Sequence, residues 1–218
     1  MGRGRTAARR VSPRNDARQP DLPLVDGGEW PASCTFLADY VWSPDVKSEL
    51  ISLYAGGKGS SRRDDQPRDA PRPVPCPLVR VRAITDATHP ACGQFGLYAA
   101  QALHHGQHVL DYLGAVSEVE DRTSDYVVDF GEHSELALDA LSMGNEARFV
   151  NDYRNTGRHA NVEFRIRRGE RGELRQGVYV CAKQVREGEE LLISYGRNYW
   201  KSRVGPDLEA FIYRRPGE

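Results

Sequence analysis

Two short segments in the second half of the chain carry side chains that could do chemistry. The first runs from Arg148 through Phe149 to Asn151, straight into a loop that is rich in asparagine and contains glycine. The second is a predicted strand that ends in Tyr195-Gly196. An asparagine amide offers both a donor and an acceptor to a bound polar group. A strand that ends in an exposed Tyr-Gly would be ordinary by itself, so the two segments are informative through their order and spacing.

The first segment resembles the SET-domain protein-lysine methyltransferases. Members of that family read D-A-x-x-x-G-N-x-x-R-F-[IV]-N, and the matching residues here are Asp139, Ala140, Gly144, Asn145, Arg148, Phe149 and Asn151. The stretch 188–196 is similar to the family's G-E-E-[IL]-x-[FYIV]-[DS]-Y-G, and the stretch 106–114 to its G-[ED]-x-[IV]-x-x-Y-x-G strand. Residues 96–99 resemble the family's first core strand, which directly follows a pair of glycines. These segments occur in the family's order.

The resemblance implies S-adenosylmethionine as the cofactor and assigns roles by position. The cofactor-binding candidates are Gly93, Gln94, Phe95, Gly96, Arg148, Phe149, Asn151 and the backbone of Asp152. The catalytic candidates are Tyr195, which would orient the lysine amine, and Tyr126, a possible wall of the lysine channel. The other channel candidates are Ile193, Tyr112 and Tyr199, although Tyr112 also suits a buried core position. No metal is implied.

The sequence departs from the family pattern at two places. Gln94 and Phe95 separate Gly93 from Gly96, where the family has a single residue. The family's H-S-C-x-P-N continuation is replaced by a longer loop that begins at Asp152, with Asn161 in place of the final asparagine. A backbone contact to the cofactor survives this change, whereas a side-chain contact from the family's histidine does not.

The chain has 218 residues, a length that favours one domain of typical size with extensions. Its net charge is −1. We expect a basic disordered tail (1–20), an N-terminal structured extension (21–56), a Pro-, Gly- and Arg-rich linker or loop (57–76), a SET domain (77–200) and a C-terminal extension (201–218). The arginine-rich tail is too polar to bury a core. It suits either a nuclear-localisation or DNA-contacting segment or a solubilising tail.

Short alternating runs separated by glycine turns predict a β-rich α+β fold of small twisted sheets. The expected strands are 78–84, 97–100, 109–116, 126–130, 162–166, 178–180 and 191–193. One helix is expected from Pro44 through Tyr54, with Ser43 as its N-cap and Gly56 as its stop. The family resemblance adds a C-terminal pseudoknot, in which the Tyr195 segment passes under the loop that holds Asn151.

Several classes of protein are disfavoured. No apolar run approaches the ~20 residues needed to span a bilayer, and the N-terminus lacks an apolar signal-peptide core. The 4 cysteines are widely spaced and favour free thiols over a zinc site. The histidines His104, His105 and His108 have no accompanying carboxylate or cysteine cluster and suit a solvated turn.

The leading hypothesis is a methyltransferase that acts on a protein lysine, with a histone or nucleosome as the favoured substrate. The tail would contact DNA, and the expected location is the nucleus, with the cytoplasm as the alternative. A non-histone substrate is the close alternative. A second hypothesis is a catalytically weak SET-like module that recruits partners, motivated by the altered loop. A third is a nucleic-acid-binding protein, based on the tail and on Arg165, Arg167, Arg168 and Arg171. The sequence does not indicate an oligomeric state.

Overall fold

The structure is a computed structural model that describes residues 30–55, 75–118, 124–131, 136–170 and 172–204. The predicted tail (1–20), nearly all of the predicted linker (57–76) and most of the C-terminal extension lie outside the described residues. In the part of the chain that the structure describes, no helix is long and apolar enough to cross a bilayer.

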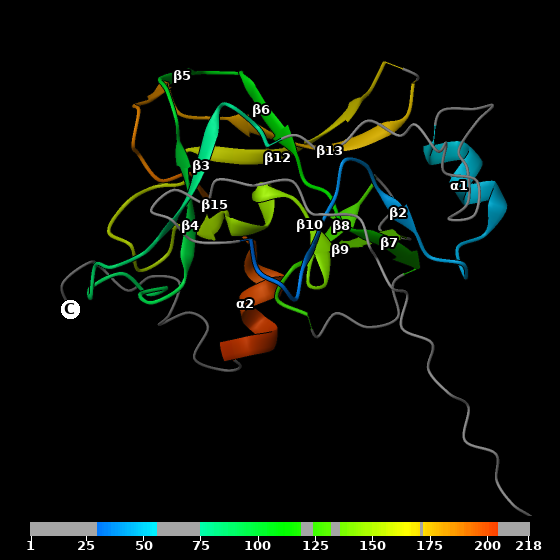
Figure 1. Ribbon diagram of the computed structural model, residues 1–218, viewed down its shortest axis with the longest axis horizontal. Helices are drawn as coiled ribbons and strands as arrows, with labels where there is room; N and C mark the ends of the chain where they lie inside the picture. Colours follow the sequence, from blue (N-terminus) through cyan, green and yellow to red (C-terminus); the bar gives the residue numbers. More distant parts are fainter. Residues whose placement is uncertain (1–29, 56–74, 119–123, 132–135, 171, 205–218) are drawn as a thin grey trace, which may run out of the picture.

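The molecule is β-rich and is built from small sheets (Figure 1). The largest sheet orders β2 (Val41–Trp42), β7 (Ala115–Glu118), β9 (Leu136–Asp139) and β8 (Val127–Phe130). A second orders β12 (Val162–Arg168), β13 (Leu174–Val180) and β6 (His108–Asp111). The two-stranded sheets are β3 (Val79–Ala83) with β4 (Phe95–Ala99), β1 (Thr35–Phe36) with β10 (Met143–Gly144), β11 (Asn151–Asp152) with β15 (Leu192–Ile193), and β5 (Leu103–His104) with β14 (Gln184–Val185).

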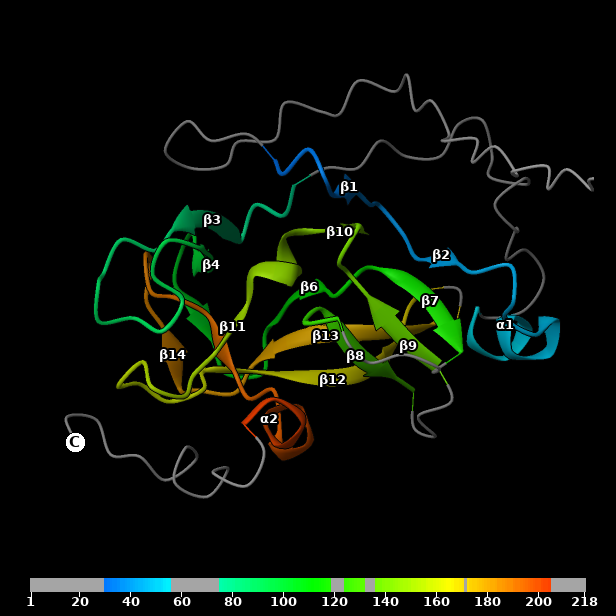
Figure 2. The same ribbon diagram turned by 90° about the horizontal axis from the view of Figure 1, so that it is seen from below.

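Helical segments are few and short in the described part of the chain. They are α1 (Ser48–Tyr54), the 3-10 helix η2 (Glu146–Phe149) and α2 (Arg197–Val204). Figure 2 shows α1 at one end of the molecule and α2 on a separate edge. The prediction of many short strands with few helices is therefore confirmed.

The strand predicted over 109–116 is wrong as a single element. Instead β6 ends at Asp111 and β7 begins at Ala115, because the chain changes sheets: β6 pairs with β13, and β7 pairs with β9. Across the break the Asn145 side chain replaces a neighbouring strand. Its Oδ1 accepts from the Leu113 amide at 3.2 Å and its Nδ2 donates to the Asp111 carbonyl at 2.8 Å. Gly114 is needed at this point because a Cβ there would lie 2.6 Å from the Asp139 carbonyl oxygen.

The predicted start of the N-terminal helix is also wrong. α1 begins at Ser48 rather than Pro44, and its N-cap position is Lys47. Ser43 directly follows β2, and its amide donates to the Val116 carbonyl at 2.8 Å, which continues the pairing with β7. The residues after it form a turn, in which the Val46 amide donates to the Ser43 carbonyl at 3.2 Å and the Val46 side chain is buried. The tertiary contact with β7 overrides the local capping signal.

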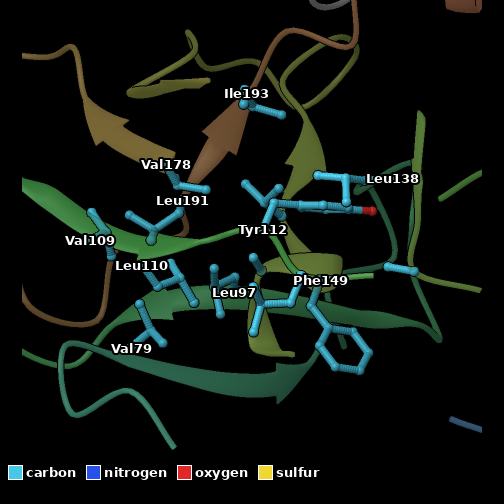
Figure 3. Packing of buried hydrophobic residues seen from close by; sticks show 14 of the residues in the cluster. Val79, Leu97, Val109, Leu110, Tyr112, Leu138, Phe149, Val178, Leu191 and Ile193 are labelled. Atoms are coloured by element: carbon cyan, nitrogen blue, oxygen red, sulfur yellow. The ribbon is translucent and has the colours of Figure 1, made fainter. Parts of the chain in front are cut away.

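The N-terminal residues share the hydrophobic core of the strands that follow. Trp30, Phe36, Tyr40 and Tyr54 belong to the same buried cluster as the strand residues. The parallel pairs β1–β10 and β2–β7 fix this segment against the second half of the chain. Figure 3 shows the centre of the cluster, where Tyr112 lies among side chains that include Leu138, Leu191 and Ile193.

Candidate functional site

The two segments singled out in the sequence lie side by side in the structure. β11 and β15 pair in parallel, with Asn151 opposite Leu192 and Asp152 opposite Ile193. The Tyr153 amide continues the contact by donating to the Ile193 carbonyl at 2.9 Å. The predicted proximity of Asn151 and Tyr195 therefore has a structural basis in one short parallel ladder.

Tyr195 is fixed against the backbone just before Asn151. Its hydroxyl donates to the Val150 carbonyl at 2.8 Å. Burial raises the pKa of this phenol well above its usual range, and the nearby Tyr199 and Asp152 add to the rise. The hydroxyl is therefore neutral and cannot serve as a base near pH 7. Its oxygen still has lone pairs that can accept from an N–H group.

The other predicted tyrosines lie close to Tyr195. The Tyr112 hydroxyl donates to the Tyr126 carbonyl at 2.8 Å. Burial also raises the pKa of Tyr112, and Tyr195 is the next largest contributor. Tyr112 is 4% exposed, so the core position considered for it in the sequence is what the structure shows. The Tyr126 ring is partly buried and lies under the Arg148 guanidinium, 4.1 Å from ring centroid to Cζ.

Helix α2 adds an aromatic wall beside Tyr195. The Tyr199 ring lies 4.7 Å from the Tyr195 ring between centroids, edge to face, and the Trp200 ring is stacked at 6.5 Å. Asp125 anchors this helix, since its Oδ1 accepts from Arg203 Nη2 at 2.6 Å.

Asp152 holds the altered loop through its side chain, whereas the sequence suggested a backbone role alone. Its Oδ2 accepts from the Tyr195 amide at 2.6 Å and from Arg154 Nη1 at 2.8 Å. The Arg154 and Asp152 side chains are only 8% and 5% exposed. The aspartate thus joins the loop after Asn151 to the turn that carries Tyr195.

The predicted cofactor residues fall into two groups. Asn151 Nδ2 donates to the Phe95 carbonyl at 3.2 Å, which brings Asn151 to the start of β4. Gly93 and Gln94 are exposed in the preceding turn, and Gly93 has a positive φ of 85°, which favours glycine. Gly96 is buried, and a Cβ there would lie 2.7 Å from Glu190 Oε1.

Arg148 and Phe149 form the second group and are engaged in packing. Arg148 Nε donates to the Ala140 carbonyl at 2.9 Å. Phe149 packs edge to face against Phe95 and Trp30, at centroid distances of 5.9 Å and 5.6 Å. These contacts support the segment that carries Asn151.

Sequence reasoning missed a buried polar cluster next to Asn151. Glu190 is 1% exposed, and its Oε1 accepts from Asn151 Nδ2 at 3.2 Å. Its Oε2 lies 3.4 Å from Arg158 Nη1 and 3.2 Å from His89 Nε2. The Ala91 amide donates to His89 Nδ1, which leaves Nε2 as the proton-bearing nitrogen of a neutral ring. Glu190 lies in one of the motifs that resemble the family pattern, whereas His89 and Arg158 lie in segments that resemble none of those motifs.

No cluster of histidine, cysteine, aspartate and glutamate side chains in the described ranges could hold a metal ion. All four cysteines lie within these ranges, and none forms a disulfide.

A comparison with protein-family models matches the SET domain over residues 94–196. Among curated proteins, the chain is similar to the histone-lysine N-methyltransferase EZH2 of Chaetomium thermophilum, with 26% identity over 130 residues. This match covers 50% of the chain and 8% of that protein, so the chain corresponds to a small part of its relative.

Solved structures of the Chaetomium thermophilum polycomb repressive complex 2 also match. The structure bound to GSK126 has 25% identity and a TM-score of 0.44, covering 59% of this chain and 17% of that one. An autoinhibited conformation bound to S-adenosylmethionine has 25% identity and a TM-score of 0.42, covering 56% and 16%.

Proposed function

Because the chain carries a SET domain over residues 94–196, we propose that it transfers methyl groups from S-adenosylmethionine to a lysine side chain of a protein. The observation that carries the proposal is the hydrogen bond from Tyr195 to the Val150 carbonyl, directly before Asn151. It supports the assignment of Tyr195 as the catalytic tyrosine beside Asn151 as the cofactor asparagine.

The residues around Asn151 fit the amino-acid end of this cofactor. The Asn151 amide and the Phe95 carbonyl supply acceptors that suit an ammonium group, and Arg158 supplies donors that suit a carboxylate. When bound, S-adenosylmethionine supplies an electrophilic methyl group. The assigned contacts of Gly93, Gln94, Gly96 and the Asp152 backbone belong to the same proposal, with Arg148 and Phe149 as supports.

The protein's part in the reaction is to position a neutral lysine amine. A charged ammonium has no lone pair, so it must lose its proton first. The aromatic surroundings of Tyr195, Tyr199 and Trp200 disfavour the charged form by desolvation. The Tyr195 oxygen accepts an N–H of the amine and orients it. Tyr126 completes the proposed channel, and the buried side chains of Tyr112 and Ile193 support it from the core.

The finer features of the fold are part of this proposal. The parallel pairing of β11 with β15 supports a pseudoknot in which the Tyr195 segment passes under the Asn151 loop. We assign the SET domain to 77–200 and a supporting extension to 21–56. The shared core of Trp30, Phe36 and Tyr40 with the strands supports that extension.

The favoured substrate is a histone within a nucleosome, and the favoured location is the nucleus. The similarity to a histone-lysine methyltransferase supports this choice, as does the arginine-rich segment 1–20, which can contact DNA phosphates. A non-histone protein is the alternative substrate. Methylation of free histone peptides and of nucleosomes by the full chain, compared with a chain lacking 1–20, separates these cases. Equal activity of both chains on nucleosomes would refute the proposed DNA contact of residues 1–20.

The test of the cofactor site is a calorimetric titration of the full chain with S-adenosylmethionine. We expect binding by the unaltered chain and a loss of at least about tenfold in Asn151→Ala, because that amide is lost from the site. Gln184→Ala is the matched control, since it removes an exposed amide on β14. A folded chain that does not bind would favour the second candidate, a recruitment module, which the altered loop after Asp152 motivates.

A further inference from the structure

Asn151 and Arg158 contact opposite oxygens of one carboxylate. Glu190 Oε1 accepts from Asn151 Nδ2 at 3.2 Å, and Glu190 Oε2 accepts from Arg158 Nη1 at 3.4 Å. The Glu190 side chain is 1% exposed, whereas the Arg158 side chain is 51% exposed. A buried anion therefore holds a neutral amide and a half-exposed cation within the width of one carboxyl group.

Both side chains keep capacity for a ligand. A guanidinium has five N–H donors. Among the described residues, the Arg158 guanidinium donates to Glu190 through Nη1 alone. In the same part of the chain, the Asn151 amide oxygen accepts no hydrogen bond, and the neighbouring Phe95 carbonyl has a second lone pair. The site thus offers carbonyl-type acceptors and a cationic fork close together.

Opposite charges meet in the site, and the exposed Asp86 carboxylate interacts electrostatically with His89 and Arg158. Glu190 contributes one negative charge and Arg158 one positive charge, while His89 contributes the proton-bearing nitrogen of its ring, 3.2 Å from Glu190 Oε2. A site of this kind suits a ligand that is itself a zwitterion, with an ammonium and a carboxylate on one carbon.

We propose that Arg158 binds the carboxylate of the amino-acid end of S-adenosylmethionine, and that Glu190 is a positioning residue for Arg158 and Asn151. This inference rests on the proposed function. A guanidinium matches a carboxylate through two parallel hydrogen bonds. Arg158 lies in the loop that departs from the family pattern, so the altered loop takes part in the cofactor site through a side chain of its own.

The test compares two ligands that differ only in that carboxylate. S-adenosylmethionine and decarboxylated S-adenosylmethionine are titrated into the full chain by calorimetry. We expect the unaltered chain to prefer the carboxylate-bearing ligand by about ten- to hundredfold, the effect of a charge-assisted hydrogen-bond pair. In Arg158→Gln this preference should fall to within about threefold, with the affinity for the decarboxylated ligand nearly unchanged.

Two further variants separate the direct role from the positioning role. Arg158→Lys keeps the charge without the fork and should retain part of the preference. Glu190→Gln should reduce the preference in the unaltered background and leave it unchanged when Arg158→Gln is already present, because the glutamate acts through the arginine. Arg165→Gln is the matched control, since Arg165 is an exposed arginine on β12 that pairs with Glu163.

The outcomes distinguish this inference from the proposed function. If the folded chain binds neither ligand, the proposed function fails, and this inference fails with it. If the chain binds S-adenosylmethionine and Arg158→Gln keeps the full preference, the cofactor site stands and the role of Arg158 is refuted.

Discussion

The hydroxyl of Tyr195 has its single proton directed at the Val150 carbonyl, and burial keeps that proton in place. This arrangement makes the tyrosine an acceptor for an approaching N–H and excludes it as a general base near pH 7. In the proposed reaction, the amine must therefore lose its proton to solvent before transfer, and desolvation by the aromatic surroundings favours that loss by lowering the pKa of the amine. The same backbone carbonyl fixes the ring position relative to Asn151.

Tyr195→Phe tests this role. We expect the rate of methyl transfer in single-turnover experiments to fall by about a hundredfold or more, the usual effect of losing one preorganised polar contact. The affinity for S-adenosylmethionine should change by less than about threefold. The free energy of unfolding should drop by about 1 kcal/mol because the Val150 carbonyl loses its donor. Tyr179→Phe, on β13, is the control, and an unchanged rate in Tyr195→Phe would refute the orienting role.

At this scale the family resemblance, which rests on the order and spacing of motifs, predicted the contact between the Asn151 and Tyr195 segments. It did not predict the cluster around Glu190. His89 and Arg158 lie in loops with no recognisable pattern, and their approach to Glu190 depends on how three distant segments pack. The side-chain role of Asp152 was missed for a related reason: its partner Arg154 lies within the substituted loop.

The elements depend on contacts that bridge irregular backbone. Between β6 and β7, Asn145 satisfies the Leu113 amide and the Asp111 carbonyl where no strand can. This position is the asparagine of the G-N pair in the matched motif. The asparagine bridges the backbone where the chain passes from one sheet to the next, and Tyr112 is buried in the core at the same break.

Asn145→Ala should lower the free energy of unfolding by about 2–3 kcal/mol, because it leaves buried backbone groups without partners. Urea denaturation monitored by tryptophan fluorescence measures the change. Arg186→Ala, at an exposed turn, is the control and should alter stability by less than about 0.5 kcal/mol. A loss as small as the control's would mean that water replaces the amide.

Short apolar and alternating runs predicted several strands, including β3, β8 and β12, but not β9 or the two-residue strands β1, β2, β5, β10, β11 and β14. They also failed at 112–114 and at the start of α1. In both places a tertiary contact, from Asn145 or from β7, replaces the local signal. Local periodicity carries no information about such partners.

Across the whole molecule, several buried tyrosines share one electrostatic property. Burial raises the pKa values of Tyr40, Tyr112 and Tyr195 above the ordinary value of about 10. Above about pH 10 the unfolded chain releases these protons while the native chain keeps them. The native state then binds more protons than the unfolded state, so the free energy of unfolding falls as the pH rises.

We therefore expect stability to decrease progressively from about pH 10 upward. Urea denaturation at pH 8 to 11 measures this slope. Tyr112→Phe should make the slope shallower, since it removes one of the groups, and comparison with the unaltered chain isolates that contribution from other titrating residues. An identical slope in both chains would show that Tyr112 ionises equally in the native and unfolded states.

The pairing of β1 with β10 and of β11 with β15 has a kinetic consequence. Each pair joins strands that are far apart in the chain, and such contacts close large loops before they gain any stabilisation. During synthesis, residues 30–36 emerge long before their partner strand β10 at 143–144. Asn151 likewise emerges well before its partner strand β15 at 192–193. The site is consequently among the last parts of the molecule to assemble, and a nascent chain lacks it until residues 192–193 have left the ribosome.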